Sequence, residues 1–457
     1  MKAYPEYKAS GIEWLGEIPK HWQILPMKYT LSKSSAGVWG DEAKDDGNDI
    51  VCFRVADFDY PHLTLGYSKI TYRSIPESQL SGREVEYGDI VIEKSGGGDL
   101  NPVGRAVIST FEGKATCSNF MHVISTNKKA NNFYLNYLLA TIYAKGQNWR
   151  YFAQTTGIQN LNVKSYLGQP IPLPPRAEQE TIAAYLDDAT GKIDALMAEK
   201  QSQVEELRSY RTSLITETVT RGLNPDAPLR PSGIDWLGNI PEHWTVAPFK
   251  RYYSTSTGIT FTKADLAESG NPVISYGQIH SSNNTGTRVE ESLIRFVPDI
   301  IVSGKQSALL SAGDFLFADT SEDFEGCGNC VYIDVDYPIY AGYHSIICKP
   351  FKLKEVFGKY LAYLYKTNVW RSQIRKQVYG VKVFSVTQTI LNKTQILLPP
   401  LSEQREIAAF LDEKTAKIDE LIGELEAELK DLADYKQAVI TEAVTGKVDV
   451  RDWKPKD

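Results

Sequence analysis

The spacing of apolar residues predicts two kinds of structure that alternate along the chain. Residues 176–222 and 401–457 follow a Leu-Pro-Pro step, begin with a Glu-rich turn that suits a helix N-terminus, and continue with helical periodicity. Elsewhere, short apolar runs bounded by Gly and Asp, such as 50–55, 89–93 and 314–318, are typical of strands. The pattern therefore predicts mixed α and β blocks separated by long helices.

Both helical segments carry a heptad repeat. Its a positions are mostly apolar: Leu186, Ile193, Lys200, Leu207 and Leu214 in the first segment, and Leu411, Ile418, Leu425, Leu432 and Val439 in the second. Its d positions are interrupted: Ala189, Leu196 and Tyr210 mix with Gln203 and Glu217, and Leu421 and Tyr435 alternate with Lys414, Glu428 and Glu442. This imperfect repeat predicts two long helices that pack on each other. The alternative is two amphipathic helices that each cover their own domain, but the matching register favours the pair.

An internal duplication organises the sequence. Residues 10–22 read SGIEWLGEIPKHW and residues 232–244 read SGIDWLGNIPEHW, while LPPRAEQETIAAYLD at 173–187 returns as LPPLSEQREIAAFLD at 398–412. Weaker echoes lie between them: a Gly-Asp-hydrophobic step at Gly88 and again at Gly313, and a helical stretch at 133–144 and again at 356–365. A unit of about 225 residues is far longer than a solenoid repeat of ~20–50 residues. We therefore infer a duplicated domain pair.

The two copies differ in how far their parts have diverged. The flanking motifs agree closely, whereas the blocks between them, about 25–170 and 247–395, share little, which suggests one structural role performed twice and two different ligands. The turn-rich segment 223–233 leads directly from the first helix into the second copy. The second block should therefore lie near the far end of that helix, and the helices should run antiparallel as a spacer with pseudo-twofold symmetry.

The expected fold class is α+β, with two α+β domains (here called head one and head two) separated by a pair of long antiparallel coiled-coil helices. The expected boundaries are 1–175 for head one, 176–222 for the first spacer helix, 223–400 for head two and 401–457 for the second spacer helix.

Composition limits the class of protein. The 457 residues are 42% hydrophobic and 23% charged, which is typical of soluble globular chains. No apolar stretch approaches the ~18 residues that span a bilayer, and the first ten residues contain no apolar signal core. Five cysteines are too few, and an odd number, for a disulfide framework. We expect a soluble cytoplasmic protein.

The net charge of −7 is unevenly distributed. Residues 23–172 carry +1 and residues 245–397 carry +3, whereas residues 176–220 carry −4 and residues 401–457 carry −6. A generally basic nucleic-acid coat is excluded, but local binding surfaces on the heads are not. The acidity lies on the helices, which we expect to face protein partners, and those partners are expected to supply much of the grip on phosphates.

Polar and Gly-rich loops in the heads carry donors that suit nucleic acid. The loops are residues 93–105, 154–160, 275–284 and 377–382. Gln and Asn side chains can pair with adenine edges, and Arg and Lys with guanine. Such loops are more often simply solvated, so on their own they indicate a surface and no more.

Motifs for catalysis are missing from the sequence. Gly98 to Gly104 is followed by Arg105, which is the wrong spacing for a Walker motif, and no Gly-x-Gly-x-x-Gly occurs. The Asn-Pro steps at Asn101, Asn224 and Asn271 are not followed by Pro and an aromatic residue, the pattern of amino-methyltransferases. We therefore predict no catalytic residues and no cofactor site for methyl transfer in this chain.

One spacing resembles a small zinc site. Cys327 and Cys330 form a C-x₂-C pair that precedes His344 and Cys348. The favoured alternative puts Cys330 and Cys348 on adjacent strands and Cys327 in a turn, so no metal site is predicted.

The repeated SGIxWLGxIPxHW opening, the Gly-Asp-hydrophobic step and the LPPxxEQxxIAxxLD helix start together resemble the specificity subunit of type I restriction-modification systems, which serve DNA methylation and anti-phage defence. The resemblance covers essentially the whole chain. It implies a non-catalytic subunit with two target-recognition domains, each reading one half of a bipartite, asymmetric site in double-stranded DNA. It also implies that the helices set the gap and dock two methyltransferase subunits, with the restriction-translocase subunits joined through them. S-adenosylmethionine, ATP and Mg would then belong to the partners.

The family does not determine which side chains contact bases, because its heads vary. The candidates in head one are Lys94, Ser95, Arg105, Gln159, Asn160 and Lys164. Those in head two are Tyr276, Gln278, His280, Lys305 and Lys382. The candidates for partner contacts are Glu178, Gln179, Leu186 and Ile193 with their counterparts Glu403, Gln404, Leu411 and Ile418. The stretch after Gly313 is acidic where the stretch after Gly88 is Gly-rich, so these candidates are not transferred between heads.

Two other functions remain as alternatives. A coiled-coil scaffold whose heads bind proteins would not show salt-sensitive affinity for DNA in the assembled complex. A self-sufficient enzyme would bind a methyl donor as an isolated chain.

Overall fold

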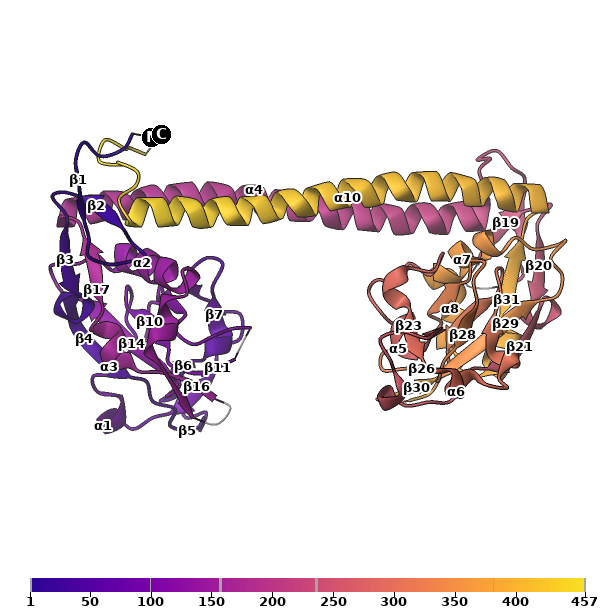
Figure 1. Ribbon diagram of the computed structural model, residues 1–457, viewed down its shortest axis with the longest axis horizontal. Coiled ribbons are helices and arrows are strands. Elements are labelled where there is room, and N and C mark those ends of the chain that lie inside the picture. Colours follow the sequence, from indigo (N-terminus) through magenta and orange to yellow (C-terminus); the bar gives the residue numbers. More distant parts are fainter. Residues whose placement is uncertain (1, 99, 156–157, 235–236, 381, 456–457) are drawn as a thin grey trace. The chain divides into compact units, whose positions relative to one another are not determined.

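The computed structural model describes residues 2–98, 100–155, 158–234, 237–380 and 382–455, without the side chains of Gln154 and Thr155 (Figure 1). Asp235 and Trp236 of the second opening motif lie outside the described residues, as do parts of three predicted loops (99, 156–157 and 381). Within the described ranges, no helix combines the length and the apolar character that crossing a membrane requires. The chain divides into two compact units, Met1–Gln201 with Ala427–Asp457, and Ser202–Glu426.

Head one, in unit 1, is built on two principal sheets. The larger has the order β4 (Leu31–Ala36), β14 (Met121–Thr126), β10 (Ile90–Glu93), β12 (Ala106–Ile108), β8 (Thr64–Leu65) and β7 (Phe58–Asp59). The other has the order β13 (Ala115–Cys117), β6 (Ile50–Phe53), β9 (Tyr72–Ser74) and β5 (Asp41–Glu42). Smaller sheets join β11 (Ser95–Gly97), β16 (Ile158–Leu161) and β15 (Phe152–Thr155), β17 (Pro170–Leu173) with β3 (Gln23–Pro26), and β1 (Tyr7–Ala9) with β2 (Glu17–Pro19). The helices are α1 (Glu77–Leu80), α2 (Asn132–Ala144) and α3 (Val163–Leu167).

Head two, in unit 2, repeats this topology with a shorter principal sheet. That sheet has the order β21 (Tyr253–Thr257), β29 (Ser345–Pro350), β25 (Phe315–Ala318) and β27 (Cys330–Tyr332). The second has the order β23 (Arg295–Val297), β22 (Asn271–Ile274), β28 (Ile339–Ala341) and β24 (Leu309–Leu310). Small pairs join β26 (Thr320–Ser321) with β30 (Phe384–Ser385), β20 (Thr245–Pro248) with β31 (Gln395–Leu398), and β18 (Leu229–Pro231) with β19 (Asn239–Pro241). The helices are α5 (Tyr276–Ile279), α6 (Asp299–Val302), α7 (Gly358–Lys366), α8 (Asn368–Arg375) and α9 (Gln388–Lys393).

The repeated Gly-Asp-hydrophobic step starts the central strand of each head. Gly88 and Gly313 have φ of 85° and 98°, a left-handed conformation that favours glycine. The following carboxylate closes the turn: Glu86 N donates to Asp89 Oδ2 at 3.0 Å, and Ser311 N donates to Asp314 Oδ2 at 2.9 Å. Strands β10 and β25 follow and are buried along their whole length. The strands predicted at 50–55, 89–93 and 314–318 and the helices predicted near 133–144 and 356–365 are confirmed.

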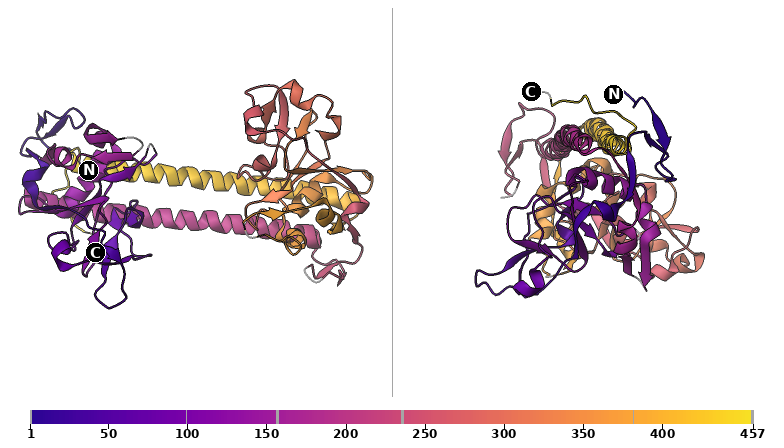
Figure 2. Two further views of the ribbon diagram at one scale, coloured as in Figure 1. Left: turned by 90° about the horizontal axis from the view of Figure 1, so that it is seen from below. Right: turned by 90° about the vertical axis from the view of Figure 1, so that its left-hand side faces the viewer.

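The long helices also follow the prediction. Helix α4 spans Arg176–Arg221 and helix α10 spans Leu401–Val444. In unit 1 the C-terminal part of α10 packs on the N-terminal part of α4, where Lys436 Nζ lies 2.5 Å from Asp194 Oδ1. In unit 2 the pair at the equivalent sequence positions brings Arg211 Nε to 2.8 Å from Asp419 Oδ1. The helices therefore pack together in antiparallel directions within each unit (Figure 2).

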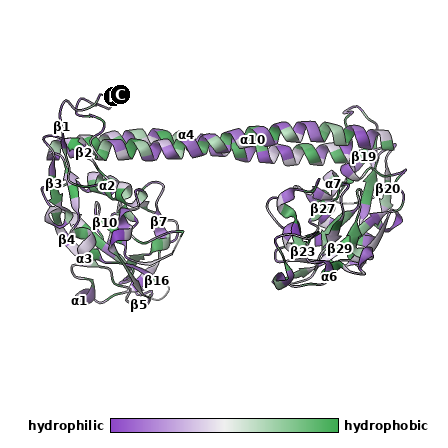
Figure 3. Cartoon of the chain, in the orientation of Figure 1, coloured by the Kyte–Doolittle hydropathy of each residue, from purple (hydrophilic) through white to green (hydrophobic). Residues whose placement is uncertain are grey.

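The second stripe of the heptad differs from the prediction. The predicted d residues Leu196, Tyr210, Leu421 and Tyr435 are 41–59% exposed. The structure instead turns the e positions inward; they are Thr190, Met197, Val204 and Arg211 in α4 and Thr415, Ile422, Leu429 and Lys436 in α10. Figure 3 shows hydrophilic and hydrophobic residues alternating along both long helices. The contact between α4 and α10 (the helix seam) is therefore lined by a and e positions. The e positions supply apolar side chains and also Arg211 and Lys436, the cations of the two ion pairs.

In each unit, one hydrophobic core cluster joins the head to the long helices. In unit 1, Ile182 and Leu186 of α4 and Ile440 and Val444 of α10 pack in the same cluster as α2. In unit 2, Ile215 and Val219 of α4 and Ile407 and Leu411 of α10 pack with α7. Further clusters lie within the heads and contain no residue of α4 or α10: one in head one includes Val51, Val91 and Val123, and one in head two includes Val273 and Ile347.

The two ends of the chain meet in unit 1. Asp449 N donates to Lys2 O at 2.8 Å, and Tyr7 Oη donates to Gly446 O at 3.1 Å. Trp453 packs edge-on against Tyr185 of α4, with ring centroids 5.8 Å apart. In unit 2 the corresponding connection, from the end of α4 to β18, is made by the continuous chain.

Candidate nucleic-acid interface

The first repeated motif fastens each opening segment to the start of a long helix. Glu178 in the first turn of α4 accepts a hydrogen bond from Trp22 Nε1 at 2.9 Å and from Tyr4 Oη at 2.6 Å, and its other oxygen lies 2.8 Å from His21 Nε2. Glu403 of α10 repeats this arrangement with Trp244 Nε1 at 3.1 Å and His243 Nε2 at 2.8 Å. The shared Trp and His of SGIxWLGxIPxHW are thus the partners of the Glu in the EQ step.

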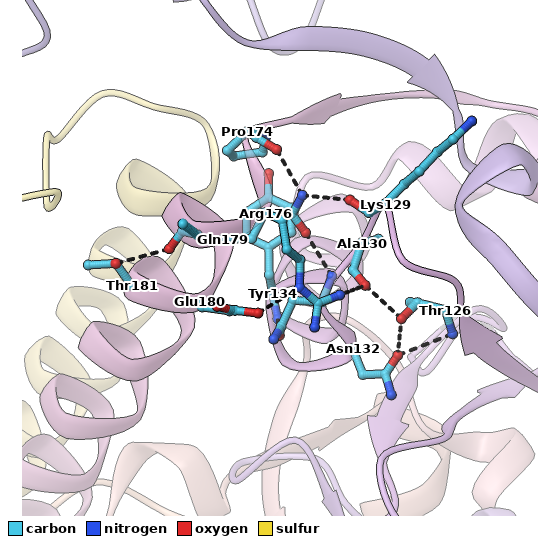
Figure 4. Close-up of polar contacts among 12 residues, drawn as sticks. Thr126, Lys129, Ala130, Asn132, Tyr134, Pro174, Arg176, Gln179, Glu180 and Thr181 are labelled. Atoms are coloured by element: carbon cyan, nitrogen blue, oxygen red, sulfur yellow. Dashed lines mark hydrogen bonds and ion pairs between the residues drawn. The ribbon is translucent and has the colours of Figure 1, made fainter.

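The Gln of the EQ step binds backbone groups of the head. Gln179 is fully buried, its Oε1 accepts from Asn131 N at 2.7 Å, and its Nε2 donates to Lys129 O at 2.9 Å and Pro174 O at 2.8 Å (Figure 4). Gln404 makes the same set: Phe357 N at 2.7 Å, Glu355 O at 3.0 Å and Pro399 O at 2.8 Å. Each Gln therefore ties a long helix to the loop that precedes α2 or α7.

All eight residues predicted for partner contacts have intramolecular roles. Leu186, Ile193, Leu411 and Ile418 lie in the helix seam at 0–8% exposure. Together with the two EQ pairs they hold the helices to each other and to the heads.

The head-one candidates gather on the small sheet beside the end of β10. Ser95 of β11 is paired in register with Asn160 of β16, and its Oγ donates to Asn160 Oδ1. Gln159 is paired with Gly97 and is largely buried, while Lys94 immediately precedes β11. These four residues from distant parts of the sequence are therefore adjacent.

The two remaining head-one candidates differ in whether their charge is free to bind DNA. Arg105 Nε donates to Glu93 Oε2 at 2.8 Å, and the Glu93 side chain is only 3% exposed, so this guanidinium neutralises a buried carboxylate. Lys164 is exposed on α3.

A pocket opens beside the head-one sheet. Its apolar walls are Trp39, Val55, Ala56 and Phe120, and its polar rim includes Ser95, Ser118 and Asn119. Phe120 is 50% exposed. No local sequence pattern marks Trp39, Asn119 or Phe120, because only the folded sheets bring these loop residues together.

The head-two candidates Tyr276, Gln278 and His280 lie on or next to α5. Gln278 accepts from Ser275 N at 3.1 Å and caps that helix. His280 Nε2 lies 2.8 Å from Thr320 O, and its Nδ1 lies 3.1 Å from Asn329 Nδ2, so this imidazole is held between backbone and amide. Tyr276 makes ring contacts with Tyr343 and His344, with centroids 5.7 and 5.5 Å apart.

The other head-two candidates are exposed lysines. Lys382 precedes β30, which pairs with β26, the strand that contains Thr320. Lys305 precedes a short 3₁₀ turn that follows α6. Among the described residues, no hydrogen bond, ion pair or ring contact links Lys305 to the α5 group.

Three of the five cysteines, Cys327, Cys330 and Cys348, are buried in head two. Among the residues that the structure describes, no three His, Cys, Asp or Glu side chains are grouped to hold a metal ion. Cys330 and Cys348 lie on β27 and β29, which are separated by β25, so the expectation of adjacent strands is wrong, while Cys327 does lie in a turn. Burial raises the pKa of the Cys330 thiol to about 12. His344 lies elsewhere, with Nδ1 3.3 Å from Asp319 Oδ1.

Comparison with known proteins decides the family. The sequence matches the type I restriction modification DNA specificity domain over residues 58–206 and 245–431, one match in each head with its adjoining helix. The chain belongs to this family. It is the DNA sequence-specificity subunit of a type I restriction-modification system, with two target-recognition domains, and is itself non-catalytic. The resemblance inferred from the repeated motifs is confirmed.

Individual relatives agree over different lengths. The specificity subunit of the type I restriction enzyme MjaVIII from Methanocaldococcus jannaschii is 24% identical over 99% of this chain and 98% of its own. The EcoKI specificity subunit of Escherichia coli is 26% identical over 48% of this chain and 46% of its own. A chain from a structure on complex assembly and conformational transition of the type I R-M system aligns with 94% of this specificity subunit and 99% of itself, with a TM-score of 0.68 and 15% identity. That structure supports the fold.

Proposed function

We propose that this specificity subunit recognises a bipartite, asymmetric site in double-stranded DNA, with each target-recognition domain reading one half. One observation carries the proposal: the two heads share strand order and register, while the side chains at matched positions differ. Head one presents Lys94, Ser95 and Asn160 beside an apolar pocket, whereas head two presents Tyr276, His280 and an acidic stretch from Asp319. Two heads with the same strand arrangement but different surface side chains suit two different half-sites.

The base-contact candidates fall into three groups under this proposal. Lys94, Ser95, Gln159 and Asn160 in head one, and Tyr276, Gln278, His280 and Lys382 in head two, form or adjoin the reading surfaces. Lys164 and Lys305 act as phosphate contacts, which position a protein on the duplex without reading sequence. Arg105 supports the surface by neutralising Glu93.

Assembly with partner subunits is the second part of the proposal. Two methyltransferase subunits dock on the helices and their junctions with the heads, and the restriction subunits join through them. The EQ pairs and the a-position residues support this role indirectly, because they hold the helices to each other and to the heads. Leu196 and Tyr435 in unit 1 and Tyr210 and Leu421 in unit 2 are exposed apolar residues at equivalent positions, which suits two copies of one partner.

Cofactor chemistry belongs to those partners in this proposal. S-adenosylmethionine, ATP and Mg bind the methyltransferase and restriction subunits, and the complex works in the cytoplasm. Head one covers 1–175 and head two covers 223–400, and the spacer regions 176–222 and 401–457 contain the helices α4 (Arg176–Arg221) and α10 (Leu401–Val444).

Methylation mapping tests the proposal directly. The chain is co-produced with a methyltransferase partner, and the methylated sequences are mapped across a genome. We expect a two-part motif, and we expect replacement of residues 25–170 by the equivalent block of another specificity subunit to change only one half of it. Methylation without a two-part motif, or a motif that this replacement leaves intact, would contradict the proposal. DNA affinity of the assembled complex that does not fall with salt would favour the protein scaffold.

A further inference from the structure

Strand register identifies one position that is shared by the two heads. In head one Glu93 of β10 pairs with Met121 of β14, and in head two Ala318 of β25 pairs with Ser345 of β29. The residues immediately before Met121 and Ser345 are Phe120 and His344. We call these two residues the matched pair.

Backbone hydrogen bonds support the correspondence. Lys94 N donates to Phe120 O at 2.9 Å, and Asp319 N donates to His344 O at 3.2 Å. The parallel strands beside them agree as well, since Cys117 of β13 pairs with Phe53 of β6 and Ala341 of β28 pairs with Ile274 of β22. The matched pair is therefore defined by geometry and not by sequence similarity.

In head one the surroundings of Phe120 are apolar and electrically neutral. Its ring is half exposed in the pocket that Trp39, Val55 and Ala56 line. The two charged side chains of this pocket are both neutralised: Arg54 holds Asp57 with Nη2 2.9 Å from Oδ1, and Glu93 is held by Arg105. Such a pocket suits an apolar group better than a phosphate or an amino group.

In head two His344 is exposed and held in an unfavourable backbone conformation. Its φ is 53°, in the left-handed region that residues other than glycine seldom adopt, and its side chain is 58% exposed. Such strain is found where surrounding structure imposes it, often at functional sites. Asp319 lies at Nδ1, and Tyr276 and Tyr343 contact the ring, so neighbouring side chains hold an imidazole that remains largely exposed.

We infer that the matched pair contacts bases and determines specificity, Phe120 for the half-site of head one and His344 for the half-site of head two. The inference rests on the proposed bipartite recognition. Phe120 and its pocket take the 5-methyl group of a thymine, because that methyl is the apolar group that base pairs present in the major groove. His344 forms a hydrogen bond through Nε2 to a base edge, while its Nδ1–H donates a hydrogen bond to the Asp319 carboxylate.

Methylation mapping with two variants tests the inference. Phe120→Ala should relax one base position in one half of the motif, and His344→Ala should relax one position in the other half. Tyr87→Ala in head one and Phe351→Ala in head two are the matched controls, because these aromatic residues are 57% and 56% exposed but lie away from the matched pair in sequence. Thermal unfolding of each variant checks that the heads remain folded. A wild-type complex without a two-part motif would overturn the proposed function itself. A two-part motif that both variants leave unchanged would overturn this inference alone.

Thymine recognition has a separate test on the assembled complex. Each thymine of the half-site read by head one is replaced in turn by deoxyuridine, which lacks the methyl group. One replacement should weaken binding about fourfold, the value of one buried methyl-sized group. The same replacement should have no effect on the Phe120→Ala complex. Equal affinity for all the deoxyuridine duplexes, or a loss that persists in the variant, would exclude the methyl contact.

Discussion

At the scale of single residues, the repeated motifs connect each long helix to an opening segment and to a head. The carboxylate of each EQ pair binds the Trp and His of an opening segment, and the amide binds three backbone groups of a head. These contacts explain why both motifs recur together in both copies, since each supplies the other's hydrogen-bond partners.

Gln404→Glu should destabilise unit 2. The substitution removes the two N–H donors that bind Glu355 O and Pro399 O and places a carboxylate oxygen against those carbonyls. We expect a loss of about 2–3 kcal/mol, as for buried polar groups left without partners. Urea unfolding of the full chain measures the loss, with Glu406→Gln on the exposed side of the same helix as the control. A loss no larger than that of the control would contradict the role.

A partly buried lysine, Lys366, should make the stability of unit 2 depend on pH. Burial, with Arg211 and Arg371 nearby, lowers the pKa of Lys366 to about 8, while its Nζ donates to Thr285 O at 2.7 Å. In the unfolded chain the group titrates near its ordinary value of ~10.4. Between these values the unfolded state binds more protons, so stability should rise as pH rises from about 8 towards 10.

Lys366→Met isolates this effect. The variant should lose the rise in stability that the wild-type chain shows between pH 8 and pH 10, the interval set by the lowered pKa. Denaturant midpoints of both chains at several pH values provide the comparison. Parallel curves would show that Lys366 does not titrate in that interval.

At the scale of elements, the helix seam follows a and e instead of a and d. Val204→Ala, at an e position that is 1% exposed, should cost about 1–3 kcal/mol through lost packing. Leu196→Ala, at a d position that is 41% exposed, should change stability by less than about 0.5 kcal/mol. Thermal or urea unfolding ranks the two variants, and the reverse order would indicate an a and d seam.

The cross-helix ion pairs should help to set the register within each unit. Lys436 and Asp194 in unit 1 correspond to Arg211 and Asp419 in unit 2. The single variant Lys436→Glu should destabilise unit 1 by placing two carboxylates together, and adding Asp194→Lys should recover much of the loss. The coupling energy from the double-mutant cycle should be about 1 kcal/mol, since the pair is partly exposed. Additive effects would mean that the pair contributes nothing.

At the scale of the whole molecule, much of the architecture was predictable from the sequence. The duplication, the helix limits near 176 and 401, the antiparallel direction and the alternation of heads with helices follow from motifs whose spacing is visible in one chain. Leu196 and Tyr210 were misplaced because a heptad label records apolar spacing, while the seam also accepts Thr, Arg and Lys. Phe120 and His344 were not selected because strand register, which no local pattern encodes, brings them to equivalent positions.

Removal of residues 447–457 should weaken unit 1 and leave unit 2 unchanged. These residues contribute the Asp449 contact to Lys2, the buried Val450 and the ring contact of Trp453 with Tyr185. Hydrogen exchange of the shortened chain should show lost protection in residues 2–22 and in the first turns of α4. Equal protection in the full and shortened chains would contradict the contribution of this segment.

The division of unit 1 between the two ends of the chain has a consequence for biosynthesis. Unit 2 is one uninterrupted segment, so every contact in it becomes possible once residue 426 has left the ribosome. Unit 1 begins first but needs Val439, Ile440, Ala443 and Val444 to complete its core. The head made first should therefore be the last to reach its final stability. Until residue 444 has been made, the faces of α2 and of the start of α4 that pack against α10 stay uncovered and prone to aggregation.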